Sequence, residues 1–231
     1  MFKQMMSYLA DSTWEDNRRQ IVGLVSKDES AKLLDCGCAD GEFTRKVALK
    51  LGTKSVFGIE IEEKKARLAE QNGIKCYQCD LNKYLPLEKE SFDLVLANQI
   101  IEHLHSTDTF VREIHRILRP GGQAIVSTPN LASVHYIFCL MLGMQPFSAH
   151  VSDEIYLGNP FNPSDKVEYG GRAHLRIFAY QGLKELFKHH GFQVETIRGS
   201  GYLPLFGPPA NLISRIDPRH AVFLTIKAKK S

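Results

Sequence analysis

The chain has 231 residues, 43% of them hydrophobic and 24% charged, a composition that excludes a disordered chain and suits one α/β domain. Its formal net charge of +3 is too small to indicate a nucleic-acid partner. The longest apolar stretch, 136–143, is too short to span a bilayer, and residues 1–10 lack the features of a secretion signal, so we expect a cytoplasmic protein.

Residues 1–30 are predicted to be helical, because Trp14, Ile21 and Val25 recur at helical spacing. From residue 32 onward, short apolar strands alternate with amphipathic helices. The pattern predicts strands at 32–35, 56–59, 74–79, 92–97 and 123–127, and helices at 42–51, 62–71 and 107–119. Such alternation is typical of a doubly wound α/β fold, in which a parallel sheet is covered by helices on both faces.

The alternation ends after residue 130. We expect residues 131–173 to form a cap inserted after the fifth strand, followed by a helix around 183–187. Two final strands are predicted at 193–198 and 221–228, joined by a Gly/Pro-rich loop that allows the last strand to run antiparallel. Because no stretch resembles a linker, residues 1–231 are predicted to form a single domain.

The motif with the most chemical information follows the first strand, where residues 33–41 read Leu-Leu-Asp-Cys-Gly-Cys-Ala-Asp-Gly. Gly37 and Gly41 allow a sharp turn and the close approach of a ligand, and the helix that follows offers free N–H groups. Asp35 would repel a pyrophosphate but would favour a ligand with cationic groups. A dinucleotide-binding turn needs Gly-x-Gly-x-x-Gly, and Ala39 replaces its second glycine.

Two more acids follow successive strands. Glu60 ends the second strand, where a carboxylate can accept hydrogen bonds from both hydroxyls of a ribose, and Asp80 follows the third strand, where it can reach an adenine amino group. Together with Asp35 they are expected at the carboxyl edge of the sheet, where open α/β sheets bind their ligands.

These motifs together resemble those of class I S-adenosylmethionine-dependent methyltransferases. The resembling segments are the glycine motif Leu33–Gly41, the ribose motif Gly58–Ile61, the adenine motif Cys79–Leu81, the fourth-strand motif Phe92–Leu104 and the turn Arg119–Gly122. The resemblance implies a seven-stranded Rossmann-like sheet with an antiparallel last strand, and S-adenosylmethionine as the cofactor. The residues expected to bind it are Asp35, Gly37, Cys38, Ala39, Gly41, Glu60, Ile61, Asp80, Leu81, Asn98 and Gln99.

Within the family, the chain resembles quinone O-methyltransferases and the W-type proteins of methionine biosynthesis. Residues 99–103, Gln-Ile-Ile-Glu-His, are similar to the Glu-x-x-Glu-His segment of the quinone enzymes, in which both glutamates and the histidine are implicated in binding a divalent metal. Gln99 is a poorer ligand than Glu for a hard cation, so we expect no metal. Ile125–Asn130 resembles the W-type segment.

His103 and His174 are the candidates for a general base, because an imidazole titrates near neutrality and a hydroxyl acceptor must lose its proton. The main task of the enzyme is to align the acceptor with the methyl group, since the sulfonium already activates that carbon. Structural roles are the alternative, a helix-start cap for His103 and a lid contact for His174.

The segment 131–144 is unusually apolar for an insertion. It could pack as a helix on the core, wall an acceptor pocket with Tyr136, Phe138 and Met141, or lie on a membrane surface. The absence of flanking Lys or Arg disfavours the membrane alternative.

The cysteines provide a further alternative. Cys36 and Cys38 follow the first strand, and Cys76 and Cys79 end the third, a spacing that could form a split metal site. Because the second strand is expected between the two pairs, we favour buried, reduced thiols.

The sequence therefore predicts methyl transfer from S-adenosylmethionine to a small or lipid-linked acceptor, with oxygen as the favoured target atom. One alternative is a protein of the same fold that binds the cofactor and regulates a biosynthetic partner. The second, a nicotinamide dehydrogenase, is disfavoured by the glycine pattern.

Overall fold

The computed structural model describes residues 2–152, 154–161 and 174–231. The helices and strands, in chain order, are α1 (Phe2–Leu24), β1 (Lys32–Cys36), α2 (Glu42–Leu51), β2 (Ser55–Ile59), α3 (Glu63–Gln71), β3 (Lys75–Tyr77), β4 (Phe92–Asn98), η1 (Ile101–His103), α4 (Thr107–Ile117), β5 (Leu118–Pro129), α5 (Val134–Met141), α6 (Tyr180–His189), β6 (Phe192–Ser200), α7 (Gly207–Ile216), η2 (Pro218–His220) and β7 (Phe223–Lys230).

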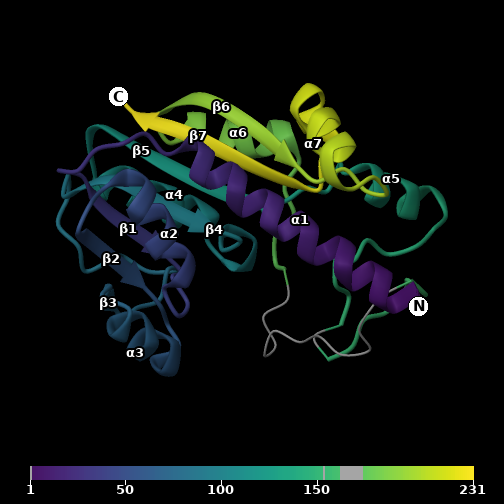
Figure 1. The fold of residues 1–231 in the computed structure, drawn as a ribbon, viewed down its shortest axis with the longest axis horizontal. Coiled ribbons are helices and arrows are strands. Elements are labelled where there is room, and N and C mark those ends of the chain that lie inside the picture. Colours follow the sequence, from purple (N-terminus) through teal and green to yellow (C-terminus); the bar gives the residue numbers. More distant parts are fainter. Residues whose placement is uncertain (1, 153, 162–173) are drawn as a thin grey trace.

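The strands form a seven-stranded sheet in the order β3-β2-β1-β4-β5-β7-β6 (Figure 1). The pairs from β3 to β5 are parallel, whereas β7 runs antiparallel to both β5 and β6. This is the predicted doubly wound sheet, including its antiparallel last strand. The strand order reverses direction between β1 and β4, which creates the crevice where such sheets bind ligands.

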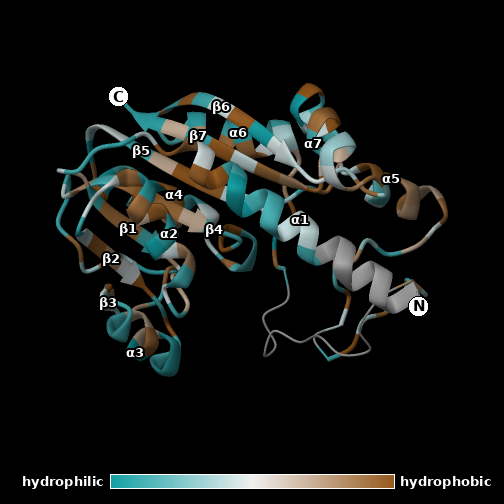
Figure 2. Cartoon of the chain, viewed as in Figure 1, coloured by the Kyte–Doolittle hydropathy of each residue, from teal (hydrophilic) through white to brown (hydrophobic). Residues whose placement is uncertain are grey.

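Alternating side chains of the central strands pack into cores on opposite faces of the sheet. Leu33 packs with α1 and α2, whereas the next residue, Leu34, packs with α4 and α6. The same alternation continues in β4 from Leu94 to Val95. These strands are therefore buried on both faces, which explains their nearly continuous hydrophobic sequence (Figure 2).

Helix α1 is joined to the sheet by one fully buried amide. The Asn17 Oδ1 atom accepts hydrogen bonds from the hydroxyls of Ser127, Ser200 and Thr225, on β5, β6 and β7. Its Nδ2 atom donates to the Asn98 Oδ1 atom at the end of β4. Because a buried amide must keep its partners, this network fixes α1 against the carboxyl edge of the sheet.

Several predicted elements differ from the structure in extent or type, among them β3, which is shorter than expected, and β5, which is longer. The Gly/Pro-rich stretch between β6 and β7 was expected to be a loop, but it contains α7, because Pro208 and Pro209 occupy the first helical turn, where proline is tolerated. Helix α4 ends at Ile117 rather than 119, since Pro120 disfavours helical geometry at Arg119 and Leu118 already pairs with Phe92 of β4.

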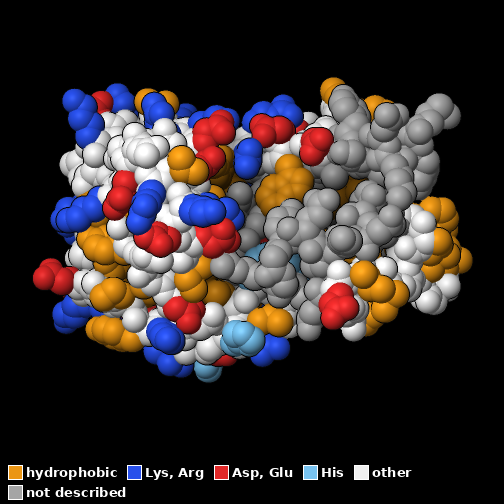
Figure 3. Space-filling view, turned by 90° about the horizontal axis from the view of Figure 1, so that it is seen from below, with side chains coloured by type: hydrophobic (Ala, Val, Ile, Leu, Met, Phe, Trp, Pro, Cys, Tyr) orange, Lys and Arg blue, Asp and Glu red, His pale blue; other side chains and the backbone are white. Residues whose placement is uncertain are grey.

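No helix among the described residues is long and apolar enough to cross a membrane. On the part of the face in Figure 3 that the described residues form, Lys and Arg side chains are interspersed with Asp and Glu. Apolar side chains gather at the end of the molecule where Figure 1 places α5.

Candidate active site

A cleft of about 1030 Å³ lies at the carboxyl edge of the sheet. Its described walls come from α1, the turn after β1, the ends of β2 and β4, and the segment after β5. The residues predicted to bind the cofactor or to act in catalysis that line this cleft are Asp35, Gly37, Cys38, Ala39, Glu60, Asn98, Gln99, His103 and His174.

The turn after β1 has the left-handed backbone that its glycines predict. Gly37 has φ +77° and Gly41 has φ +81°. A Cβ atom on Gly37 would lie 2.1 Å from the Ile100 Cδ1 atom, and one on Gly41 would lie 2.2 Å from the Ile74 Cδ1 atom. Ala39 has φ 49° and therefore occupies a conformation that favours glycine. Both glycines are thus required by backbone conformation and packing.

Asp35 lies at the base of the turn and is 3% exposed. Its Oδ2 atom accepts a 2.5 Å hydrogen bond from the hydroxyl of Thr44 on α2. Burial raises the pKa of Asp35 to about 7; the Thr44 bond opposes this rise and the nearby charge of Glu60 adds to it. A cationic ligand beside Asp35 would favour its ionised form.

Glu60 is 7% exposed and faces the same turn. Its Oε2 atom accepts a 3.1 Å hydrogen bond from the Ala39 N–H group, and its Oε1 atom accepts one of 2.9 Å from the Glu62 N–H group. The carboxylate is therefore held in one orientation at the edge of the cleft, as a receptor for two vicinal hydroxyls requires. Glu60 is therefore not an exposed surface acid.

Four residues of the predicted cofactor set do not line the cleft. Gly41 packs under Ile74, Ile61 is 45% exposed, and Leu81 belongs to the core between the sheet and α4. Asp80 follows β3 by three residues, and its Oδ1 atom accepts hydrogen bonds from the backbone and side chain of Asn82, which lower its pKa. An adenine contact by Asp80 stays a prediction.

The end of β4 carries a left-handed residue that the sequence did not reveal. Gln99 has φ 58°, and its Nε2 atom donates a 3.0 Å hydrogen bond to the hydroxyl of Ser127. The Ser127 hydroxyl in turn donates to Asn17. Asn17 of helix α1, acting through Ser127, therefore positions the end of β4 that lines the cleft.

Helix α1 contributes Thr13, Trp14 and Arg18 to the cleft. The Arg18 guanidinium lies 5.5 Å from the centre of the Phe43 ring. Its Nη1 atom pairs with Glu15 at 3.2 Å, whereas its buried Nε atom has no hydrogen-bond partner among the described residues. A guanidinium in a ligand cleft with a donor to spare is suited to a carboxylate. Only the folding of α1 over the sheet reveals this residue.

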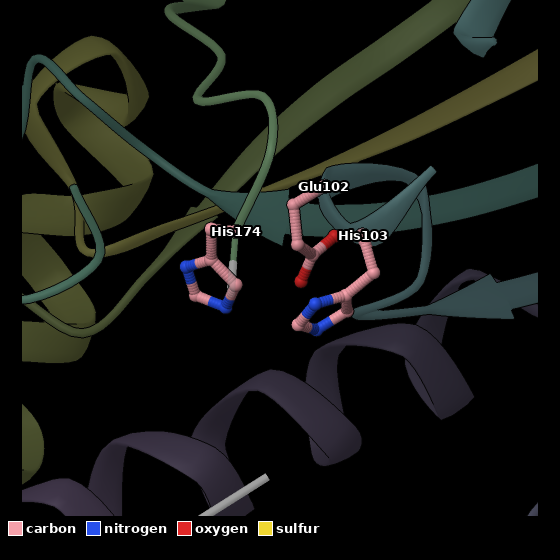
Figure 4. Close-up of side chains that lie close together, drawn as sticks. All are labelled: Glu102, His103 and His174. Atoms are coloured by element: carbon pink, nitrogen blue, oxygen red, sulfur yellow. The ribbon is translucent and has the colours of Figure 1, made fainter. Parts of the chain in front are cut away.

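The other half of the cleft brings His174 together with two neighbouring residues that are distant from it in sequence, Glu102 and His103. Glu102 and His103 lie on η1, and His174 comes from the loop before α6 (Figure 4). The His103 and His174 ring centres are 4.7 Å apart, and the Glu102 carboxyl points between the two imidazoles. The backbone oxygen of Glu102 also accepts hydrogen bonds from Leu175 and Arg176, which holds the two segments together.

Glu102 is 1% exposed, and burial raises its pKa to about 8. Its Oε2 atom accepts a 3.1 Å hydrogen bond from the Thr128 hydroxyl, whereas its Oε1 atom has no partner among the described residues. Burial also lowers the pKa of His174 to about 4, with further contributions from His103 and His150. The His174 Nδ1 atom lies 3.1 Å from the Ser148 carbonyl oxygen and donates to it, so the Nε2 atom is left as an acceptor.

The same three residues offer one ligand atom each, all within 4.8 Å of one another, which is a geometry that can hold a metal ion. Two imidazoles and one carboxylate suit a transition metal better than Mg²⁺, which prefers oxygen ligands. In the sequence, only Glu102 and His103 stood out as strong metal ligands. The structure adds His174 as a third metal ligand, in place of Gln99. A bound ion there would act as a Lewis acid towards an acceptor hydroxyl.

Residues of the described part of the segment 131–173 line the half of the cleft that holds His103 and His174. Tyr136 is buried there, and His150 stacks on His174 with ring centres 5.5 Å apart. Phe138 and Met141, expected beside Tyr136, are instead 59% and 77% exposed and do not line the cleft, because the helix turns them to the opposite side. Residues 162–173 of the expected cap lie outside the described residues.

The raised pKa of Glu102 gives a testable dependence of stability on pH. Between pH 4.5, the ordinary pKa of a glutamic acid side chain, and about pH 8, the unfolded chain releases this proton while the folded chain keeps it. The stabilisation is therefore fully present below pH 4.5 and is lost as the pH rises through 8. The melting temperature of the wild type should fall more steeply between about pH 5 and about pH 9 than that of Glu102→Gln, which keeps an acceptor for Thr128.

Thermal unfolding of both proteins without ligand is the measurement. Asp35 affects the melting temperature of both proteins in the same way. The difference between their two curves of melting temperature against pH therefore isolates the effect of Glu102. Parallel curves would show that Glu102 titrates normally.

Comparisons with known proteins identify the family. A family model described as a methyltransferase domain matches residues 34–126. The ubiquinone biosynthesis O-methyltransferase of Pseudomonas syringae pv. tomato is 30% identical over 209 residues, which cover 80% of this chain and 83% of that protein. The mitochondrial ubiquinone biosynthesis O-methyltransferase of Rattus norvegicus is 25% identical over 86% of this chain, which spans about half of that relative (53%).

Solved structures show the same fold. An S-adenosylmethionine-dependent methyltransferase from Thermotoga maritima, described as a possible histamine N-methyltransferase, has a TM-score of 0.64 at 20% identity and covers 97% of this chain and 92% of its own. One from Mesorhizobium loti has a TM-score of 0.64 at 20% identity and covers 92% of this chain and 96% of its own. The chain therefore belongs to the class I S-adenosylmethionine-dependent methyltransferases, in which it resembles the ubiquinone biosynthesis O-methyltransferases and uses S-adenosylmethionine as its cofactor.

Proposed function

We propose that the chain transfers the methyl group of S-adenosylmethionine to a hydroxyl of a small or lipid-linked aromatic acceptor. The observation that carries the proposal is the division of the cleft. One half holds the glycine turn with Asp35 and Glu60, and the other holds His103 and His174 beside a buried Glu102. The described lining of the second half contains no Lys, Arg or Asp, which favours a neutral acceptor.

In this mechanism the protein binds and aligns the reactants. Glu60 accepts the ribose hydroxyls, and Asp35 favours the cationic end of the cofactor. Arg18 is suited to the cofactor carboxylate, because its guanidinium lies at the cleft with a donor to spare. Holding the acceptor oxygen in line with the methyl carbon can lower the barrier by up to roughly 10 kcal/mol.

The proton step is assigned to the histidines. A neutral His103 takes the proton of the acceptor hydroxyl as the oxygen–carbon bond forms and the carbon–sulfur bond breaks, which yields S-adenosylhomocysteine and the methyl ether. His174, kept neutral by burial, offers its Nε2 atom as an alternative acceptor for the proton of this hydroxyl. Protonated Glu102 can donate to the acceptor at neutral pH.

The similarity to ubiquinone biosynthesis O-methyltransferases supports an acceptor of the quinone-precursor class, a phenol that carries an apolar chain. The test is an assay with labelled S-adenosylmethionine, the purified chain and a panel of catechols with and without an alkyl tail. We expect S-adenosylhomocysteine only when a catechol is present. No turnover with any hydroxyl acceptor, combined with stable co-purification of a biosynthetic enzyme, would replace the proposal by the regulatory alternative.

We extend the proposal to a transient membrane contact through 131–144, which would give access to a lipid-linked acceptor. Helix α5 exposes Phe138 (59%) and Met141 (77%) while Tyr136 on its other side lines the cleft. Burying such a side chain in lipid contributes about 1.5–3 kcal/mol. The double substitution Phe138→Ser/Met141→Ser should therefore lower binding to neutral lipid vesicles at least tenfold.

Vesicle flotation measures this binding. Leu212→Ser/Ile216→Ser is the matched control, since α7 exposes these apolar residues on a different element. Equal binding of wild type and the α5 variant would contradict the contact. A cytoplasmic location is part of the same proposal, and cell fractionation tests it.

A further inference from the structure

Two thiols meet at the base of the cofactor turn. The Cys38 Sγ atom, in the turn after β1, lies 3.8 Å from the Cys76 Sγ atom of β3. Because strand β2 runs between β1 and β3, we expected these two cysteines to lie apart. They are nevertheless in contact.

Gly58 of β2 is the reason for this contact. It pairs with Cys76 in the parallel register, and a Cβ atom on Gly58 would lie 2.5 Å from the Cys38 Sγ atom. Any other residue would occupy the space that the Cys38 side chain uses to cross β2. The missing side chain therefore brings the two sulfurs together.

Cys38 also belongs to the cofactor cleft. It lines the cleft, and the next residue, Ala39, donates its N–H group to Glu60. The N–H groups of Gly37 and Cys38 both donate to the Ile59 carbonyl oxygen, at 2.8 and 3.1 Å. A displacement of Cys38 would therefore change the backbone that positions Glu60.

We propose that Cys38 and Cys76 are a modification site, at which hydrogen peroxide forms a reversible disulfide that weakens cofactor binding. One thiol loses its proton, and the thiolate attacks a peroxide oxygen and breaks the O–O bond; the hydroxide that leaves takes up this proton, which gives a sulfenic acid and water. The second thiol likewise loses its proton, and its thiolate attacks the sulfenic sulfur and displaces hydroxide, which takes up the second proton. Two thiols and one peroxide thus become one disulfide and two waters. A thiol reductant reverses the reaction.

The geometry makes the second step fast, because the partner sulfur is already in contact. Burial raises the pKa of both thiols, so little thiolate is present at neutral pH and the first step is slow. Closing the bond requires the sulfurs to approach from 3.8 Å to about 2.0 Å, which draws Cys38 towards β3 and away from the position it holds in the cleft. The proposal goes beyond methyl transfer and does not depend on the acceptor.

The test starts from fully reduced wild-type protein treated with hydrogen peroxide. Digestion without reductant, followed by mass spectrometry, should yield one cross-linked peptide pair that contains Cys38 and Cys76 and has lost two hydrogens. The affinity for S-adenosylhomocysteine, measured by calorimetry, should fall at least tenfold and return after dithiothreitol. S-adenosylhomocysteine added before the peroxide should slow the cross-link, because Cys38 lines the cleft.

Cys76→Ser should bind S-adenosylhomocysteine as reduced wild type does and keep that affinity in peroxide. Cys79→Ser, the matched control, should lose affinity like the wild type. A cross-link between other cysteines, a Cys38–Cys76 cross-link without loss of affinity, or equal loss in Cys76→Ser would each overturn the proposal. So would stoichiometric Zn²⁺ binding that needs both thiols and prevents oxidation, which would indicate a metal site. Failure of the reduced protein to methylate any acceptor would contradict only the proposed function.

Discussion

Replacing His103 by alanine is expected to lower the maximal rate of methyl transfer by roughly 10²–10⁴-fold, the usual contribution of a positioned general base. S-adenosylmethionine affinity should stay nearly unchanged, because the charged groups assigned to the cofactor, Asp35, Glu60 and Arg18, lie on β1, after β2 and on α1. The measurement is steady-state kinetics with the acceptor identified in the assay above, together with calorimetry of cofactor binding. His105→Ala is the matched control, since His105 is exposed and does not line the cleft.

Two outcomes would change the assignment. An unchanged rate in His103→Ala would remove this residue from the chemistry. Wild-type activity that is abolished by a chelator and restored by a divalent ion would instead make Glu102, His103 and His174 metal ligands, as their spacing allows. The acid limb of the pH–rate profile separates the two histidines: a limb near pH 4 indicates His174, and one well above it excludes His174 as the base.

Replacing Glu60 by alanine should weaken S-adenosylmethionine binding by about 1–3 kcal/mol, or about 5- to 150-fold. The substitution removes the acceptor of the ribose hydroxyls and also leaves the N–H groups of Ala39 and Glu62 without their carboxylate partner. Calorimetry measures the loss. Glu63→Ala is the control, because Glu63 is exposed on α3 and pairs with Arg67 rather than facing the cleft.

This second prediction is also a test of the cofactor assignment. Wild-type protein that binds neither S-adenosylmethionine nor S-adenosylhomocysteine, or that prefers a nicotinamide dinucleotide, would contradict it. If Glu60→Ala binds as the wild type does, the ribose is held elsewhere in the cleft. Thermal unfolding of the variant should accompany the titration, so that a folding defect is not mistaken for lost affinity.

Local chemistry along the chain was sufficient to predict most of the fold and the backbone of the turn that lines the cleft. Residues 42–51 were expected to be helical and form α2 over the same residues, because hydrophobic spacing and flanking glycines act within one element. Gly37 and Gly41 were predicted to turn sharply and have positive φ angles. Glu60 could be placed because parallel strands bring their carboxyl ends to one edge.

The remaining features depend on contacts between residues far apart in the chain, which no local pattern encodes. His174 meets His103 because the loop before α6 bonds to the backbone of Glu102. Arg18 reaches the cleft because the buried amide of Asn17 fixes α1 over the sheet. Cys38 meets Cys76 because Gly58, on the strand between them, has no side chain to separate them.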